Sequence, residues 1–246
     1  MFMFKKNRKP IIGIVAKPYY HSGQPKEVTV DDWRMSIEKC GGVPISILPP
    51  QSTHDIAKKY NVENANVRSA PDLTLAEKRD LFQVLRLCDG IVLEGGMSCH
   101  RYEIDIAKWA IDHNVPLIGS CAGFNNIVWA AGGEVRWGTK DEIARHNRPY
   151  AEKYVHDVTV MKGSHLSKIV GVDAPRLCVN SRHWMMVEPA MVKDLNIVAV
   201  SDDGLVEAVE LPRKKFVLGL KWHPESMIDY DPHQRKIIEN FIDACK

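Results

Sequence analysis

The first half of the chain alternates short apolar runs with amphipathic segments, and this alternation restricts the folds it can adopt. The apolar runs are Pro10–Ala16, Val43–Leu48, Gly90–Leu93 and Val115–Gly119. The segments with helical periodicity are Asp31–Cys40, Leu75–Leu87 and Ile104–His113. Strands that alternate with helices along a chain form a parallel sheet with helices on its faces. We therefore expect an α/β fold built on a mainly parallel central sheet.

The second half of the chain has a different pattern, with short apolar runs separated by turn residues. Strands are predicted at Val155–Val160, Arg176–Val179, Ile197–Ser201, Val206–Glu210 and Phe216–Trp222. Pro232–Ala244 is predicted to form an amphipathic helix. Residues 51–74 are polar and lack periodicity, which predicts a long loop. Because no repeat, low-complexity tract or linker divides the sequence, we expect one domain over residues 1–246.

Charge and cysteine usage narrow the partners and the compartment. The net charge is only +2 and neither sign is concentrated in one half, which argues against nucleic acid as a partner. No apolar run approaches the roughly 18 residues of a membrane span, and the N-terminal segment lacks the apolar region of a signal peptide. The six cysteines form no CxxC pair, so neither a disulfide framework nor a zinc site is predicted from them. A reducing, cytoplasmic compartment is expected.

Cys121 stands where the predicted strand Val115–Gly119 turns into a helical segment that runs to Ala131. Gly119 and Gly123 flank it at −2 and +2, which is the spacing of a nucleophile elbow with cysteine in place of serine. Each glycine permits a close backbone approach, and a helix N-terminus lowers the pKa of a nearby thiol. This pattern predicts a nucleophilic thiolate; the alternative is a buried cysteine of the core.

A base and a carboxylate follow the last predicted strand, at His223 and Glu225. In an extended segment residues i and i+2 point to the same side, so Glu225 would orient the imidazole. Pro224 disfavours helix at His223 and fixes its own φ. A structural histidine is the alternative, since nine others occur in the chain.

A third feature is the pair Gly95-Gly96 directly after the predicted strand Gly90–Leu93. Such a turn can direct the N–H of Gly96 at a developing oxyanion, with the N–H of Ala122 as the second donor. The alternative is a turn that only ends the strand.

In order and spacing, these three features resemble class I glutamine amidotransferase domains, and within them the γ-glutamyl-γ-aminobutyrate hydrolase family. The resemblance runs from about residue 10 to residue 245. Further matching segments are residues 10–18, Cys40–Pro44, Arg101–Asp105, Val179–His183 and Asp203–Ala208.

This resemblance implies a flavodoxin-like three-layer sandwich and a hydrolase that cleaves a γ-glutamyl amide through a thioester. It implies a catalytic triad of Cys121, His223 and Glu225, an oxyanion hole of Gly96 and Ala122, and substrate contacts from Gly95, Asn125, Ser181 and His183. It requires neither a metal nor an organic cofactor. The expected partner is a small γ-glutamyl substrate, without nucleic acid or membrane; the oligomeric state stays open, a homo-oligomer included.

Several positions depart from the family pattern around the implied substrate site. Ala122 replaces the usual Arg, Asn125 replaces a Gln, and Met185 replaces a Gln. The segment Met97–His100 is shorter than its family counterpart and lacks the usual Asp-x-x-Pro-x-x-Tyr. These changes concern specificity, because all three triad residues are retained.

Other interpretations are compatible with the sequence. The adjacent pair Cys99-His100 is a rival nucleophile and base, but neighbouring side chains on an extended backbone point apart. The chain could be a glutaminase subunit that delivers ammonia to a synthetase, or a non-catalytic binding module of the same fold. The tryptophans Trp129, Trp137 and Trp184 are interpreted as packing residues.

Overall fold

A nine-stranded sheet runs through the centre of the computed structural model, which describes residues 8–21, 24–51, 72–96, 100–171 and 176–246. Five strands are mutually parallel: β4 (Val43–Ile47), β1 (Ile11–Val15), β5 (Gly90–Leu93), β6 (Leu117–Ser120) and β13 (Val217–Leu220). The sheet continues with antiparallel neighbours: β12 (Val206–Glu210), β11 (Asn196–Ser201), β8 (His156–Val160) and β9 (Arg176–Val179). The change of pattern between the halves of the sequence is therefore the change from parallel to antiparallel pairing.

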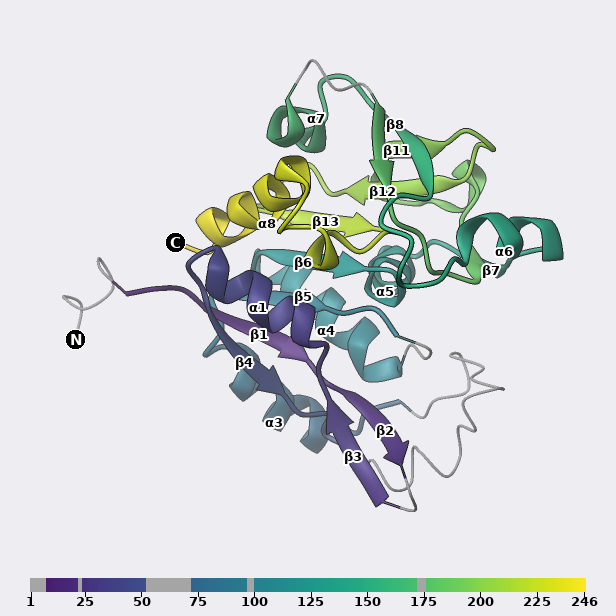
Figure 1. The fold of residues 1–246 in the computed structure, drawn as a ribbon. Helices are drawn as coiled ribbons and strands as arrows, with labels where there is room; N and C mark the ends of the chain where they lie inside the picture. Colours follow the sequence, from purple (N-terminus) through teal and green to yellow (C-terminus); the bar gives the residue numbers. More distant parts are fainter. Residues whose placement is uncertain (1–7, 22–23, 52–71, 97–99, 172–175) are drawn as a thin grey trace.

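Helices cover both faces of the sheet (Figure 1). On one face lie α1 (Asp31–Lys39), α7 (His165–Val170) and α8 (Pro232–Ala244); on the other lie α3 (Leu75–Leu85), α4 (Arg101–Asp112) and α5 (Ala122–Ala130). Each face has its own apolar core, because the parallel strands are apolar on both sides. The expected three-layer α/β fold is confirmed. In the described part of the chain, no helix has the length and apolarity needed to cross a bilayer.

Several short elements were not expected from the sequence. A hairpin of β2 (Lys17–His21) and β3 (Gln24–Val28) projects from the sheet, and β7 (Arg136–Trp137) pairs with β10 (Met185–Met186). The helix α6 (Lys140–His146) starts at a capping box in which Thr139 accepts from the N–H of Glu142. These elements are too short or too polar to give a periodic apolar signal. Most of the predicted loop, residues 52–71, lies outside the described residues.

The order of the strands determines where the predicted site lies. Strand β6 stands between β5 and β13, and Gly119 pairs with Leu93 on one side and Gly219 on the other. Because all three strands are parallel, their carboxyl ends meet at one edge of the sheet. The segments that follow them carry Gly95-Gly96, Cys121 and His223 to the same place.

Candidate active site

Cys121 occupies a strained turn between β6 and α5. It is the N-cap of α5, with φ 51° and ψ −102°, a backbone conformation that non-glycine residues rarely adopt. The flanking glycines make the turn possible: a Cβ on Gly119 would lie 2.6 Å from the carbonyl carbon of Gly123, and one on Gly123 would overlap the backbone of Leu93. The backbone thus has the form expected of a nucleophile elbow.

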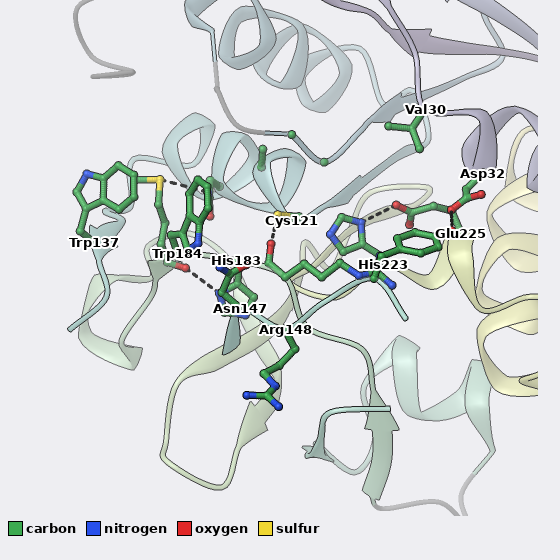
Figure 2. Close-up of a pocket in the computed structure, with 17 residues that line it drawn as sticks. Val30, Asp32, Cys121, Trp137, Asn147, Arg148, His183, Trp184, His223 and Glu225 are labelled. Atoms are coloured by element: carbon green, nitrogen blue, oxygen red, sulfur yellow. Dashed lines mark hydrogen bonds and ion pairs between the residues drawn. The ribbon is translucent and has the colours of Figure 1, made fainter. Parts of the chain in front are cut away.

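His223 lies between Cys121 and Glu225 (Figure 2). Its Nδ1 is 2.8 Å from Oε1 of Glu225, which leaves Nε2 to face the thiol. The expectation of an extended segment here was wrong, because Pro224–Ser226 forms a 3₁₀ turn. Proline is favoured at the first position of such a turn, where its missing N–H costs no hydrogen bond. The turn still brings the two side chains together, by a different local geometry.

The backbone around His223 is held from both sides by Asn180. The amide of Asn180 donates to the carbonyl of His223 at 2.9 Å and accepts from its N–H at 2.8 Å. The hydroxyl of Ser36 donates to the carbonyl of Glu225, and that of Ser120 donates to its carboxylate at 3.3 Å. These bonds fix the imidazole and the carboxylate relative to the elbow.

The electrostatics of the site favour a thiolate next to an imidazolium. Burial alone would raise the pKa of Cys121, but a hydrogen bond with His223 and the positive charge of that ring outweigh it and hold this pKa below its ordinary value. The buried Lys221 and the N–H of Gly96 act in the same direction. Burial lowers the pKa of His223, yet the charge of Glu225 and the hydrogen bond with the thiol raise it overall.

The diglycine turn lies against Cys121. The backbone N–H of Gly96 points at the sulfur of Cys121, and a Cβ on Gly95 would lie 2.6 Å from Cε1 of His223. Ala122 begins α5 directly after Cys121 and lines the same cavity. The turn therefore needs glycine for close approach, beyond merely ending a strand.

Cys121 opens into a cavity of about 410 Å³ (Figure 2). Of the residues predicted from the sequence, Gly95, Gly96, Cys121, Ala122, Asn125, His183, His223 and Glu225 line it. Ser181 does not: it is fully buried, and its hydroxyl donates to the carbonyl of His146. We therefore correct its assignment from substrate contact to a structural hydrogen bond.

Asn125 and Met185, two of the positions that depart from the family pattern, contact each other. Oδ1 of Asn125 accepts from Nζ of Lys221 at 2.7 Å, and its Nδ2 contacts the sulfur of Met185 at 3.7 Å. The shorter amide and the methionine thus fit each other. Lys221 is buried beside the thiol and supplies a cation that sequence reasoning did not assign to the site.

The cavity has further walls that the sequence did not indicate. Trp137 and Trp184 lie near each other at the end away from Glu225, with ring centroids 6.5 Å apart. Arg148 and Arg182 also line the cavity. The carbonyl of Arg182 is 3.8 Å from the sulfur of Cys121. The two tryptophans, interpreted above as packing residues, therefore border the cavity. Their position at the cavity becomes evident only in the folded chain, where β7 pairs with β10.

His183 is buried at the cavity wall, and burial lowers its pKa well below the ordinary value. Behind the wall it meets three other side chains that could together hold a metal ion: His146, His156 and Glu207.

Of the rival pair Cys99-His100, only His100 lies within the described residues. His100 is buried, it does not line the cavity, and burial lowers its pKa to about 4. Such an imidazole is poorly suited to accept a proton and hold it near neutral pH.

Iodoacetamide at mildly acidic pH is expected to label Cys121 before any other cysteine. Burial raises the pKa of Cys40 and of Cys88 to about 11, and raises that of Cys178 and Cys245, whereas that of Cys121 is lowered. Only the thiolate is a good nucleophile. Peptide mapping of samples alkylated for increasing times gives the order of labelling. Preferential labelling of Cys99 would overturn the assignment of Cys121.

Comparison with known proteins places the chain in a family. Residues 97–225, more than half of the chain, match the family Peptidase C26. The γ-glutamyl-γ-aminobutyrate hydrolase PuuD of Escherichia coli is 27% identical over 264 residues, which cover 96% of this chain and 94% of that protein. A glutamine amidotransferase-like protein of Lactococcus lactis, YvdE, is 30% identical over 196 residues, covering 70% of this chain and 80% of that one.

Solved structures agree on the fold. The glutaminase domain of the Trypanosoma brucei CTPS has a TM-score of 0.62 at 21% identity, covering 96% of this chain and 93% of that one. A glutamine amidotransferase of Thermotoga maritima has a TM-score of 0.56 at 12% identity, covering 97% of both chains. Both share the class I glutamine amidotransferase fold. The chain therefore belongs to the Peptidase C26 family, as a hydrolase with the fold of class I glutamine amidotransferases.

Proposed function

We propose that this hydrolase cleaves γ-glutamyl amides by transferring the γ-glutamyl group to Cys121. One observation carries the proposal: a thiol of lowered pKa, an imidazole hydrogen-bonded to it and a carboxylate 2.8 Å from that imidazole together line a cavity of about 410 Å³. This is the arrangement needed for a nucleophile, its base and the group that orients the base.

In the first half of the reaction, the thiolate of Cys121 attacks the γ-carbonyl carbon, and the carbonyl oxygen becomes an oxyanion. The N–H groups of Gly96 and Ala122 are the proposed donors to this oxygen. The imidazolium of His223 then protonates the departing nitrogen as the C–N bond breaks. The products of this half are a free amine and a γ-glutamyl thioester.

In the second half, His223 acts as a base. It takes a proton from a water molecule, whose oxygen attacks the thioester carbon while the same donors hold the oxyanion. The C–S bond breaks and the thiolate of Cys121 returns, paired with the imidazolium. Glu225 fixes the tautomer and stabilises the positive ring in both halves.

The shape of the cavity favours a substrate with a large amine portion. Ala122 and Asn125 leave room beside the nucleophile, and Trp137 and Trp184 offer apolar ring surface further along the cavity. A site for free glutamine needs tightly packed polar partners, because unpaired buried polar groups are expensive. The γ-glutamyl-γ-aminobutyrate hydrolase activity in the name of the Escherichia coli relative agrees with this substrate class.

The isolated chain is expected to turn over a γ-glutamyl-amine or γ-glutamyl-peptide at least about tenfold faster than glutamine, measured as kcat/KM. Steady-state kinetics on a panel of γ-glutamyl compounds measures this ratio, and mass spectrometry locates the acyl adduct. Hydrolysis of glutamine alone, and only after a synthetase is added, would instead support the glutaminase-subunit alternative.

A matched pair of variants tests the aromatic end of the cavity within the same assay. Trp137→Ala should lower kcat/KM about three- to tenfold for substrates with a large apolar amine, and should leave glutamine unaffected. Leu75→Ala removes an apolar side chain that is 88% exposed and lies outside the cavity, so it should change neither rate. Equal effects of Trp137→Ala on both substrates would contradict the assignment.

A further inference from the structure

Four ligating side chains, three of them buried and one half-buried, converge behind the cavity wall, and they come from four separate parts of the fold. They are His146 at the end of α6, His156 at the start of β8, His183 after β9 and Glu207 in β12. One ligand atom of each lies within 4.8 Å of the others. His146, His183 and Glu207 are each more than nine-tenths buried. The convergence is therefore set by the fold, since no two of the four are neighbours in sequence.

The outward-facing nitrogen of each histidine is already engaged. Nε2 of His146 is 3.0 Å from the carboxylate of Asp203. Nδ1 of His156 is 3.2 Å from the carbonyl of Asp157, and Nδ1 of His183 is 3.1 Å from that of Met185. These oxygens only accept hydrogen bonds, so each engaged nitrogen carries a proton. The remaining nitrogen of each ring faces the other members of the cluster.

Five ring and carboxylate atoms face the centre of the cluster. They are Nδ1 of His146, Nε2 of His156, Nε2 of His183 and both carboxylate oxygens of Glu207, and none has a hydrogen-bond partner within the described ranges. Buried polar atoms in native proteins are normally paired, so this group of unpaired atoms points to a ligand at its centre. A cation at the centre would satisfy all four side chains at once.

The spacing and chemistry of the donors suit a transition metal. Nδ1 of His146 and Nε2 of His183 lie 3.4 and 3.6 Å from Oε1 of Glu207. Donors in a tetrahedral zinc site with bonds of 2.0–2.1 Å are about 3.4 Å apart. Three imidazoles and one carboxylate are ligands that Zn²⁺ prefers, and a histidine backed by a carboxylate, as His146 is by Asp203, is the usual outer-shell arrangement.

We propose that His146, His156, His183 and Glu207 bind one Zn²⁺-like divalent metal as a structural site. Four protein ligands close the coordination sphere, which distinguishes the site from a catalytic zinc with an open position. The metal would tie α6, β8 and β12 to the segment after β9. That segment includes Arg182, whose carbonyl contacts the sulfur of Cys121, so the site would hold the cavity wall. The proposal does not depend on the γ-glutamyl substrate.

The first test uses the intact protein, purified without a histidine tag. Its metal content is measured by plasma mass spectrometry, and the chelated protein is then titrated with ZnCl₂ while Tm is followed. We expect one zinc per chain and a Tm that rises until one equivalent is bound. Co²⁺ in place of Zn²⁺ should give the visible absorption of a tetrahedral complex. Absence of bound metal together with a Tm indifferent to zinc overturns the proposal.

Variants then identify the ligands by the zinc affinity of each purified chain. Glu207→Gln and His156→Asn should weaken zinc binding at least about 100-fold, and Asp203→Asn, which leaves all four ligands in place, about 10- to 100-fold. His113→Asn, an exposed histidine outside the cluster, should bind zinc like the parent. If the ligand variants do not fold, the zinc affinity of Asp203→Asn and the zinc titration of the parent protein still test whether the site binds metal. Unchanged affinity in Asp203→Asn and the ligand variants that fold refutes the site.

Discussion

The His223→Asn variant is expected to lose about four orders of magnitude in kcat/KM toward its best γ-glutamyl substrate. The substitution removes the group that protonates the leaving amine and the group that activates water, because both are the same imidazole. It also removes the charge that lowers the pKa of Cys121. Steady-state kinetics measures the loss, and alkylation by iodoacetamide at pH 6 should slow in parallel.

His165→Asn is a suitable control, because this histidine is exposed and lies outside the cavity. It should keep the parent activity and the parent rate of alkylation. Thermal unfolding of both variants separates lost chemistry from lost structure. Activity within tenfold of the parent in a folded His223→Asn chain would contradict the role of His223 as the proton carrier.

The buried strands and the amphipathic helices could be predicted from the sequence because their apolar patterns are strong. Strand β5 has the predicted bounds Gly90–Leu93, and α8 the predicted bounds Pro232–Ala244. Every residue of β5 is buried, so the whole strand reads as one apolar run. The hairpin of β2 and β3 carries prolines, lysines and a histidine, and it pairs outside the central sheet, so no such run marks it.

The proposed nucleophile, base and carboxylate could be predicted because each lies in a local motif with a mechanical reason for its spacing. Side chains that reach the cavity from distant segments could not. Lys221 looks like any strand-end lysine until the fold places its ammonium 2.7 Å from the amide of Asn125. The same limit applies to His146, His156, His183 and Glu207, which are far apart in the sequence and meet only in the folded chain.

Glu225→Gln is expected to lower kcat/KM by roughly two orders of magnitude, less than the loss of His223. Gln keeps the size of the side chain and can still contact the ring, so the proton carrier survives. What disappears is the negative charge that raises the pKa of His223. A less basic imidazole holds its proton less well and stabilises the thiolate of Cys121 less.

The loss of the Glu225 charge should also change the pH profile of kcat/KM in a definite direction. The active form carries a thiolate and an imidazolium, so activity rises as Cys121 loses its proton and falls as His223 loses its own. Without the charge of Glu225, the pKa of His223 falls and the alkaline limb moves to lower pH. At the acid limb the imidazolium is populated in both proteins, so this limb should stay in place. The bell should therefore narrow from the alkaline side.

The matched control for the profile is Glu38→Gln, which removes a carboxylate from the exposed face of α1. It changes the net charge of the protein by the same amount and should leave both limbs in place. If Glu225 had only a structural role, its loss would lower the rate at every pH without moving the limbs. A displaced imidazole would be badly oriented toward the thiol, but its pKa would be unchanged. A pH profile of kcat/KM that is lower at every pH but equally wide would therefore show that Glu225 is a structural residue. A narrower profile would show that the charge of Glu225 is the property that matters for activity.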